Sequence, residues 1–242
     1  MNSLVKYLEW DSNFFDFPVF KIDYTSDVEI EKVFSVNRNQ TALYYVFSEN
    51  IILNASVLAN YNGKLVDEKV LFTKQGLEFK NNITNSFELY TETIPNDKLY
   101  ELARISGKYS RYKTDKRLPS FTFEKMYNLW IENSCMNKNC VIYVCKHENN
   151  IVGFITLEIS SNSGSVGLIA VDNSMQGKGL GYELMCIAEN HLIGLGIDNI
   201  SVATQINNKK ALNFYGRLGY KVETKSNIYH FILNKKDSEN SI

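Results

Sequence analysis

The sequence predicts an α/β fold, and three observations carry the prediction. Segments with the apolar character of strands alternate with segments of helical spacing along most of the chain. The 242 residues are 44% hydrophobic and 22% charged, as in an ordinary globular protein. A buried strand, a glycine-rich turn and a helix follow one another between Ser165 and Gly196. We expect the rest of the chain to be arranged around this last segment.

Residues 1–94 are predicted to form a smaller α/β layer. Strands are expected over 18–24, 42–48, 64–74 and 86–92, and helices over 27–36 and 51–61. Leu8 to Phe15 is an aromatic cluster with two interpretations, the plug of a small core or the wall of an acceptor pocket. Pro95 lies in the best linker, because it restricts Ile94 and because Asn96 or Asp97 can cap a helix. Two domains are therefore predicted, residues 1–94 and 95–242.

A basic segment interrupts the first two helices of the second domain. A helix is expected to begin near Leu99 and another to cover 121–134, with a break over 106–119. Between Arg104 and Arg117 there are six basic residues and one acidic residue, Asp115. Such a run is usually a solvated face. The alternative is an anion site, since arginine and lysine interleaved with tyrosines suit a diphosphate next to a stackable base.

The glycine-rich turn has the features of a phosphate site. The apolar strand Val166 to Val171 is followed by Gln176, Gly177, Lys178, Gly179, Leu180 and Gly181, and then by a helix. A helix N-terminus of this kind presents free backbone N–H groups, and glycines let the backbone approach an anion closely. The spacing fits neither the nucleotide-triphosphate loop nor the dinucleotide fingerprint. A turn without any ligand is the alternative.

The pattern Gln176-x-x-Gly179-x-Gly181 resembles the pyrophosphate signature of the GNAT acetyltransferases, which use acetyl-coenzyme A. A strand over 198–204 and a helix over 208–217 follow, and the spacing Asn208-x-x-Ala211-x-x-x-Tyr215 resembles the second half of that coenzyme site. The resemblance covers roughly residues 97–233. It implies the GNAT fold, a mixed and mostly antiparallel central sheet that is splayed at the coenzyme site and flanked by helices, beside the smaller N-terminal α/β domain.

The resemblance also implies roles for individual residues. Tyr215 would be the general acid that protonates the departing thiolate, although a core aromatic is its alternative role. Asn208 would bind the coenzyme or merely cap its helix. The other residues expected at acetyl-coenzyme A are Ile169, Ala170, Val171, Gln176, Gly177, Lys178, Gly179, Leu180 and Gly181. Those expected at the acceptor are Ser110, Arg111, Tyr112 and Lys113. No general base is identified, and no metal site is predicted.

A narrower resemblance concerns the acceptor. The segments LEWDSNFF, SGKYSRYKTDKRLPS and FEKMYNLWIENS, together with the coenzyme motifs, resemble the dTDP-fucosamine acetyltransferases. That likeness implies acetyl transfer to the 4-amino group of a dTDP-4-amino-4,6-dideoxyhexose in surface-polysaccharide synthesis. Two alternatives stay open. One is a GNAT enzyme for another small amine or a protein N-terminus, and the other is a non-catalytic module that binds acetyl-coenzyme A.

Charge and hydropathy limit the other partners. A net charge of −1 gives no bulk attraction to nucleic acid or to an anionic membrane. No apolar run reaches the length of a membrane span, and Met1 to Asp11 lacks the apolar core of a signal peptide. The expected location is therefore the reducing cytoplasm, and the expected partner is a small nucleotide-sugar substrate. The oligomeric state stays open, with a homodimer as one arrangement.

Overall fold

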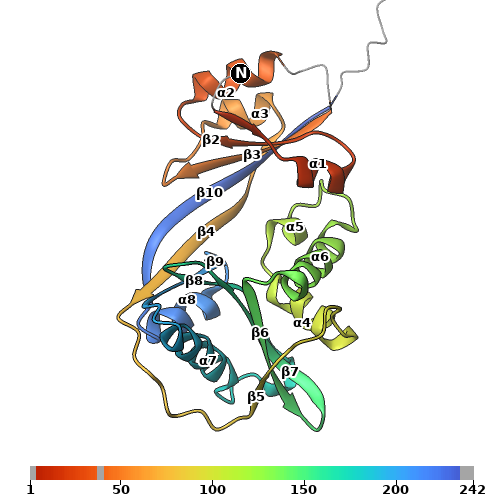
Figure 1. Ribbon diagram of the computed structural model, residues 1–242. Helices are drawn as coiled ribbons and strands as arrows, with labels where there is room; N and C mark the ends of the chain where they lie inside the picture. Colours follow the sequence, from red (N-terminus) through yellow and green to blue (C-terminus); the bar gives the residue numbers. More distant parts are fainter. Residues whose placement is uncertain (1–3, 37–40, 235–242) are drawn as a thin grey trace, which may run out of the picture. The chain divides into compact units, whose positions relative to one another are not determined.

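The computed structural model describes residues 4–36 and 41–234, which belong to two compact units (Figure 1). Unit 1 takes the described residues up to Lys69 and those from Thr224 onward, and unit 2 runs from Val70 to Glu223. The chain enters unit 2 along β4 (Gly63–Gln75) and leaves it along β10 (Lys221–Leu233). Residues 70–94 thus group with unit 2. The division into domains at residue 95 stays a prediction.

Unit 1 contains strands in the order β1-β2-β3-β10, in which only the β2–β3 pair is parallel. Its core holds Phe34, Tyr44 and Phe231, each at most 1% exposed. The predicted aromatic cluster forms a helix in which Phe14 and Phe15 are buried, whereas Trp10 is exposed and stacks on Phe14. The remaining elements of this unit are β1 (Val5–Tyr7), α1 (Glu9–Phe15), β2 (Val19–Asp23), α2 (Asp27–Val36), β3 (Ala42–Glu49) and α3 (Ala55–Asn60).

Unit 2 is a mixed sheet between two pairs of helices. The strand order is β4-β9-β8-β7-β6-β5, and β8–β9 is a parallel pair among antiparallel ones. Helices α4 and α6 pack on one face and α7 and α8 on the other (Figure 1). The elements are β5 (Phe87–Leu89), α4 (Asp97–Ser106), α5 (Arg111–Thr114), α6 (Thr122–Met136), β6 (Cys140–His147), β7 (Asn150–Ile159), β8 (Gly164–Val171), η1 (Asn173–Met175), α7 (Leu180–Gly194), β9 (Asn199–Gln205) and α8 (Lys209–Arg217).

Strand β8 separates from β9 part of the way along its length. The two strands pair from Gly164↔Ile200 to Val166↔Val202, yet β8 continues to Val171. The register of β8 against β7 shifts at the same level, where the N–H of Leu168 donates to Oγ1 of Thr156 at 2.7 Å. Such a bulge bends a strand and increases its twist. The splay expected for the fold therefore begins at Gly167.

A long connection between β4 and β5 lies against α7, because side chains of α7 bind the backbone of the connection. The Glu183 carboxylate accepts hydrogen bonds from the backbone N–H groups and side chains of Thr84 and Asn85, at 2.7–3.2 Å. Asn190 binds both the N–H and the carbonyl of Lys80. Glu183 is 6% exposed. Its burial raises the carboxyl pKa, but the four donors together outweigh burial and leave that pKa below its usual value.

The bulge predicts a strict requirement for glycine at position 167. A Cβ there would lie 2.8 Å from Oγ1 of Thr156, the acceptor that holds Leu168. We expect Gly167→Ala to reduce the free energy of unfolding by about 1–3 kcal/mol, as overpacking of a tight site does. Denaturant titration measures this quantity. The control is Gly194→Ala at the end of α7, where a Cβ meets no atom within 4 Å; equal effects of the two substitutions would contradict the prediction.

Candidate functional site

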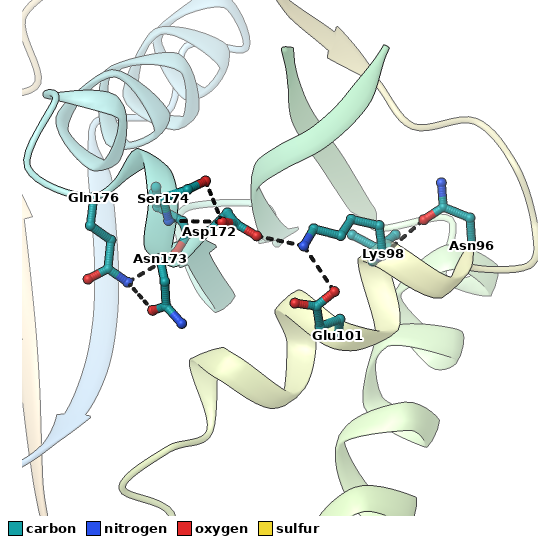
Figure 2. Close-up of polar contacts among 9 residues, drawn as sticks. Asn96, Lys98, Glu101, Asp172, Asn173, Ser174 and Gln176 are labelled. Carbon is teal, nitrogen blue, oxygen red and sulfur yellow. Dashed lines mark hydrogen bonds and ion pairs between the residues drawn. The ribbon is translucent and has the colours of Figure 1, made fainter. Parts of the chain in front are cut away.

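The turn after β8 is held in place by its own side chains (Figure 2). Asp172 ends the strand, and its Oδ1 accepts hydrogen bonds from the N–H and the hydroxyl of Ser174, at 2.9 and 2.7 Å. Nε2 of Gln176 donates to the carbonyl of Val171 and to Oδ1 of Asn173, both at 3.1 Å. The predicted site residue Gln176 therefore ties the turn back to the strand end.

The next residues give α7 an N-terminus without a side-chain cap. Gly177 and Gly179 have φ angles of +79° and +84°, in the left-handed region that glycine adopts most easily. Gly179 is the N-cap residue and has no side chain to cap the helix, and none of the described side chains accepts a hydrogen bond from the N–H groups of Leu180 to Tyr182. A Cβ on either glycine would meet no protein atom within 4 Å. Backbone N–H groups and a helix dipole thus face open space, which suits a phosphate group.

The end of β8 offers its backbone. Ala170 packs into the core on the α4–α6 side of the sheet, and Ile169 and Val171 pack on the α7–α8 side. Since their side chains are used in packing, any contact of these predicted residues with a ligand would come from main-chain groups. Beyond Val166 these groups have no β9 partner in the described pairing.

Asn208 and Tyr215 lie on or next to α8. The Asn208 side chain accepts a hydrogen bond from the N–H of Ala211 at 3.2 Å and donates to Oγ1 of Thr204 at 3.3 Å, so it caps its helix. Tyr215 is 4% exposed, near the rings of Phe72 and Phe214. No described residue hydrogen-bonds its hydroxyl. Burial raises the pKa of Tyr215, so the phenol stays protonated at neutral pH.

The predicted acceptor residues form the first three positions of the short helix α5 and its N-cap, but their side chains have different surroundings. Ser110 caps the helix by accepting a hydrogen bond from the N–H of Tyr112. Tyr112 is buried and packs edge-on against Trp130. The Arg111 guanidinium lies 4.5 Å from the Tyr112 ring centre and donates to its hydroxyl at 2.7 Å. The Lys113 ammonium lies over the Phe123 ring. Arg111 and Lys113 therefore carry the charge of this group.

The basic segment is less charged in the fold than its sequence implies. Arg117 binds both oxygens of the buried Asp115 at 2.9 Å. Arg104 contacts Glu124 at 3.5 Å and Asn128 at 2.9 Å. Two of the six basic side chains thus serve the packing of this region. Sequence spacing could not reveal the contacts of Arg104, because Glu124 and Asn128 lie on the next helix.

Sequence reasoning missed the charged contact at the start of the turn. Nζ of Lys98 on α4 lies 2.6 Å from Oδ2 of Asp172 and 2.9 Å from Oε2 of Glu101 (Figure 2). The hydrogen bonds from Lys98 and Ser174 hold the pKa of Asp172 well below its usual range, and the two carboxylates raise the pKa of Lys98. The pair is therefore charged across the neutral range.

The described part of the chain offers little support for a cysteine nucleophile, a metal site or a membrane span. Its four cysteines are free, and burial is the first cause that raises the pKa values of Cys135 and Cys140 to about 11. Such thiols are poor nucleophiles at neutral pH. Among the described residues, no three His, Cys, Asp or Glu side chains gather as metal ligands do. None of the described helices has the length and apolar character needed to cross a membrane.

Sequence comparisons relate the chain to three proteins with names of their own. The chain is 29% identical over 148 residues to the dTDP-fucosamine acetyltransferase of Escherichia coli O6:H1, covering 60% of this chain and 62% of that protein. It is 25% identical over 130 residues to the spore coat polysaccharide biosynthesis protein SpsD of Bacillus subtilis, covering 54% and 45%. It is also 25% identical over 122 residues to the N-alpha-acetyltransferase MAK3 of Arabidopsis thaliana, covering 49% and 59%. The chain spans about half to three fifths of the length of these relatives.

Solved structures share the fold. A GCN5-related N-acetyltransferase from Sphaerobacter thermophilus superposes with a TM-score of 0.58 at 12% identity, covering 95% of this chain and 76% of that one. The model of the acetyltransferase (GNAT) family, whose members use acetyl-coenzyme A, matches residues 99–220, just over half of the chain. The expected GNAT fold and the resemblance stated from the glycine motif are both confirmed. This chain belongs to the GNAT family of acetyltransferases.

Proposed function

We propose that this protein transfers the acetyl group of acetyl-coenzyme A to the amino group of a nucleotide-linked amino-deoxy sugar. The observation that carries the proposal is the separation of β8 from β9 after Val166, next to the open N-terminus of α7. Together they place unpaired strand groups and unpaired helix N–H groups at the two ends of one turn. Family membership supplies the reaction type.

The turn would bind the pyrophosphate of the coenzyme. The N–H groups of Leu180 and Gly181 begin α7 and would donate to phosphate oxygens, while Gly177 and Gly179 leave room for them. Lys178 adds a positive charge on the exposed side of the turn. Bound acetyl-coenzyme A would supply an activated thioester. The backbone of Ile169 to Val171 would then orient the acetyl group and donate to the developing oxyanion.

Tyr215 would donate the proton that the departing thiolate needs. The Tyr215 side chain is buried, no described residue binds its hydroxyl, and its raised pKa keeps the proton in place until charge develops on sulfur. Asn208 would act on the coenzyme only indirectly, since its side chain is used as a helix cap. The described residues give no reason to assign a general base.

The acceptor proposal rests on chemistry near α5 and on two relatives. Arg111 and Lys113 are neighbouring cations on this helix, and both could contact a diphosphate. Ser110 and Tyr112 would hold that helix in shape. The dTDP-fucosamine acetyltransferase and the spore coat polysaccharide protein favour an amino sugar. The similarity to an N-alpha-acetyltransferase favours a second candidate, a protein N-terminus.

The first prediction concerns Gly179. We expect Gly179→Ala to weaken acetyl-coenzyme A binding at least about tenfold, equivalent to ~1.4 kcal/mol, because the new methyl group occupies space meant for phosphate. Isothermal titration calorimetry gives the affinity. The matched control is Gly196→Ala at the other end of α7, where φ is +73° and no atom lies within 4 Å of the added Cβ. Both substitutions carry a similar left-handed strain of roughly 1–2 kcal/mol, so an equal loss of affinity would contradict the prediction.

The second prediction concerns Tyr215. We expect Tyr215→Phe to lower kcat by about 10²-fold or more, the usual loss for a general acid, while acetyl-coenzyme A affinity and stability change little. In the unmodified enzyme, kcat should show no alkaline decline due to this phenol below its ordinary pKa of about 10. The pH profile of thiol release measures both effects. Tyr220→Phe is the control, since its hydroxyl binds Glu189; full activity of Tyr215→Phe would exclude the acid role.

The third prediction tests the acceptor. In a thiol-release assay with acetyl-coenzyme A, we expect turnover with dTDP-linked 4-amino-4,6-dideoxyhexoses and at least about tenfold lower kcat/KM with the same sugars lacking the nucleotide. The reason is the charge-assisted contact expected from Arg111 and Lys113, worth about 1.5–3 kcal/mol. Peptides with free N-termini test the second candidate. Turnover of peptides but not of amino sugars would replace the proposed acceptor, and thioester binding with no turnover of any amine would indicate a binding module.

A further inference from the structure

The turn that would bind the coenzyme is also held by a residue outside the turn. Asp172 is bound on both oxygens, with Ser174 of its own turn on one and Lys98 of α4 on the other. Its N–H donates to the carbonyl of Val152 at 2.8 Å, and its carbonyl accepts from the N–H of Met175 at 2.9 Å. The Asp172 side chain is only 17% exposed. This residue is thus the fixed point from which the turn begins.

Lys98 connects that point to a helix on the face of the sheet opposite α7. Lys98 lies in the first turn of α4, one residue before Leu99. Leu99 is fully buried and belongs to the same hydrophobic cluster as Ala170 of β8. Asn96 caps the same helix end by accepting a hydrogen bond from the N–H of Leu99 at 2.9 Å. Helix α4 is therefore firmly seated, and the Lys98 ammonium reaches Asp172 from a rigid base (Figure 2).

The glycines that follow Asp172 have no side chains that could fix the conformation of the turn. Gly177 and Gly179 lie between η1 and α7, and glycine has more accessible backbone conformations than any other residue. In the first part of the turn, the ties are the Asp172–Ser174 contacts and the Gln176 contacts to Val171 and Asn173. Helix α7 itself is seated by packing, since Leu180 is 2% exposed and clusters with Val171 and Met175. Those ties therefore act on the loop between β8 and α7, including the backbone around Gly177 and Gly179. Preorganised donors bind an anion better than donors that must be ordered on binding.

We propose that Lys98 is a positioning residue for coenzyme binding, which acts through Asp172 to hold the glycine turn in its anion-binding shape. The inference rests on the proposed coenzyme site and adds a residue outside its motif. Lys98 need not touch the coenzyme. Its ion pair with Asp172 joins α4, which leads into the proposed acceptor segment, to the turn that begins the coenzyme site.

The test is calorimetric titration of the full chain with acetyl-coenzyme A. We expect Lys98→Met to raise the Kd about two- to thirtyfold, the range for residues that act through a contact network. Lys98→Arg keeps the charge and should restore most of the affinity. Glu101→Gln is the matched control, because it removes the other carboxylate at Lys98 and leaves the Asp172 contact in place. It should bind like the unmodified protein.

A second variant separates positioning from general loss of structure. Asp172→Asn keeps an oxygen for Ser174 but removes the charge that faces Lys98, and it should weaken binding to a similar degree. The double variant should then be no weaker than either single one, since both break the same contact. Unchanged affinity of a folded Lys98→Met or Asp172→Asn protein would overturn the inference. Failure of the unmodified protein to bind acetyl-coenzyme A would overturn the proposed function itself, and the inference with it.

Discussion

The separation of β8 from β9 is the constraint on which the rest of the site depends. Two parallel strands that stayed paired to their ends would satisfy each other's N–H and carbonyl groups and leave nothing for a ligand. Here the Thr156 hydroxyl accepts the hydrogen bond of the Leu168 N–H, so β8 can bend at Gly167 without losing a partner there. The bend directs the end of the strand, and the turn that follows it, away from β9.

Helix α7 has an open N-terminus, while two glutamates along the helix are bound by other parts of the protein. Glu183 takes four hydrogen bonds from the β4–β5 connection, and the buried Glu189 pairs with Lys74 at 2.8 Å and accepts the Tyr220 hydroxyl at 2.9 Å. Both carboxylates are therefore bound by donors of the protein itself. The arrangement matters because an unpaired carboxylate in the first turn would repel a phosphate at the same helix end. The four donors on Glu183 are neutral, so the carboxylate keeps its charge, but they hold it against the β4–β5 connection.

Much of the fold could be predicted from local pattern, because it depends on spacing within single elements. Helix α2 has the predicted bounds, and the strand–turn–helix around Gly179 was identified from six residues. The long-range features were not predictable in this way. One local feature also could not be predicted: the β6–β7 hairpin turns through Glu148 and Asn149, both at positive φ, and glutamate is not a residue expected in such a turn. The partners of Arg104, which are Glu124 and Asn128, lie on the next helix and could not be inferred from spacing. Lys98 is 74 positions from Asp172, and no motif relates the two.

The surroundings of two tyrosines explain why Tyr215, and not Tyr220, is proposed as the acid. Tyr215 and Tyr220 have ring centres 6.0 Å apart, and both are buried with raised pKa values. For Tyr220 the causes are burial and then Glu189, the carboxylate to which its hydroxyl already donates. Giving that proton to a thiolate would leave two anions facing each other in a buried place. Tyr215 owes its shift to burial alone, so its proton is retained at rest and is not committed to another group. Because burial makes the phenolate costly, Tyr215 would first stabilise a departing thiolate through a hydrogen bond, and its proton would follow only as the C–S bond breaks.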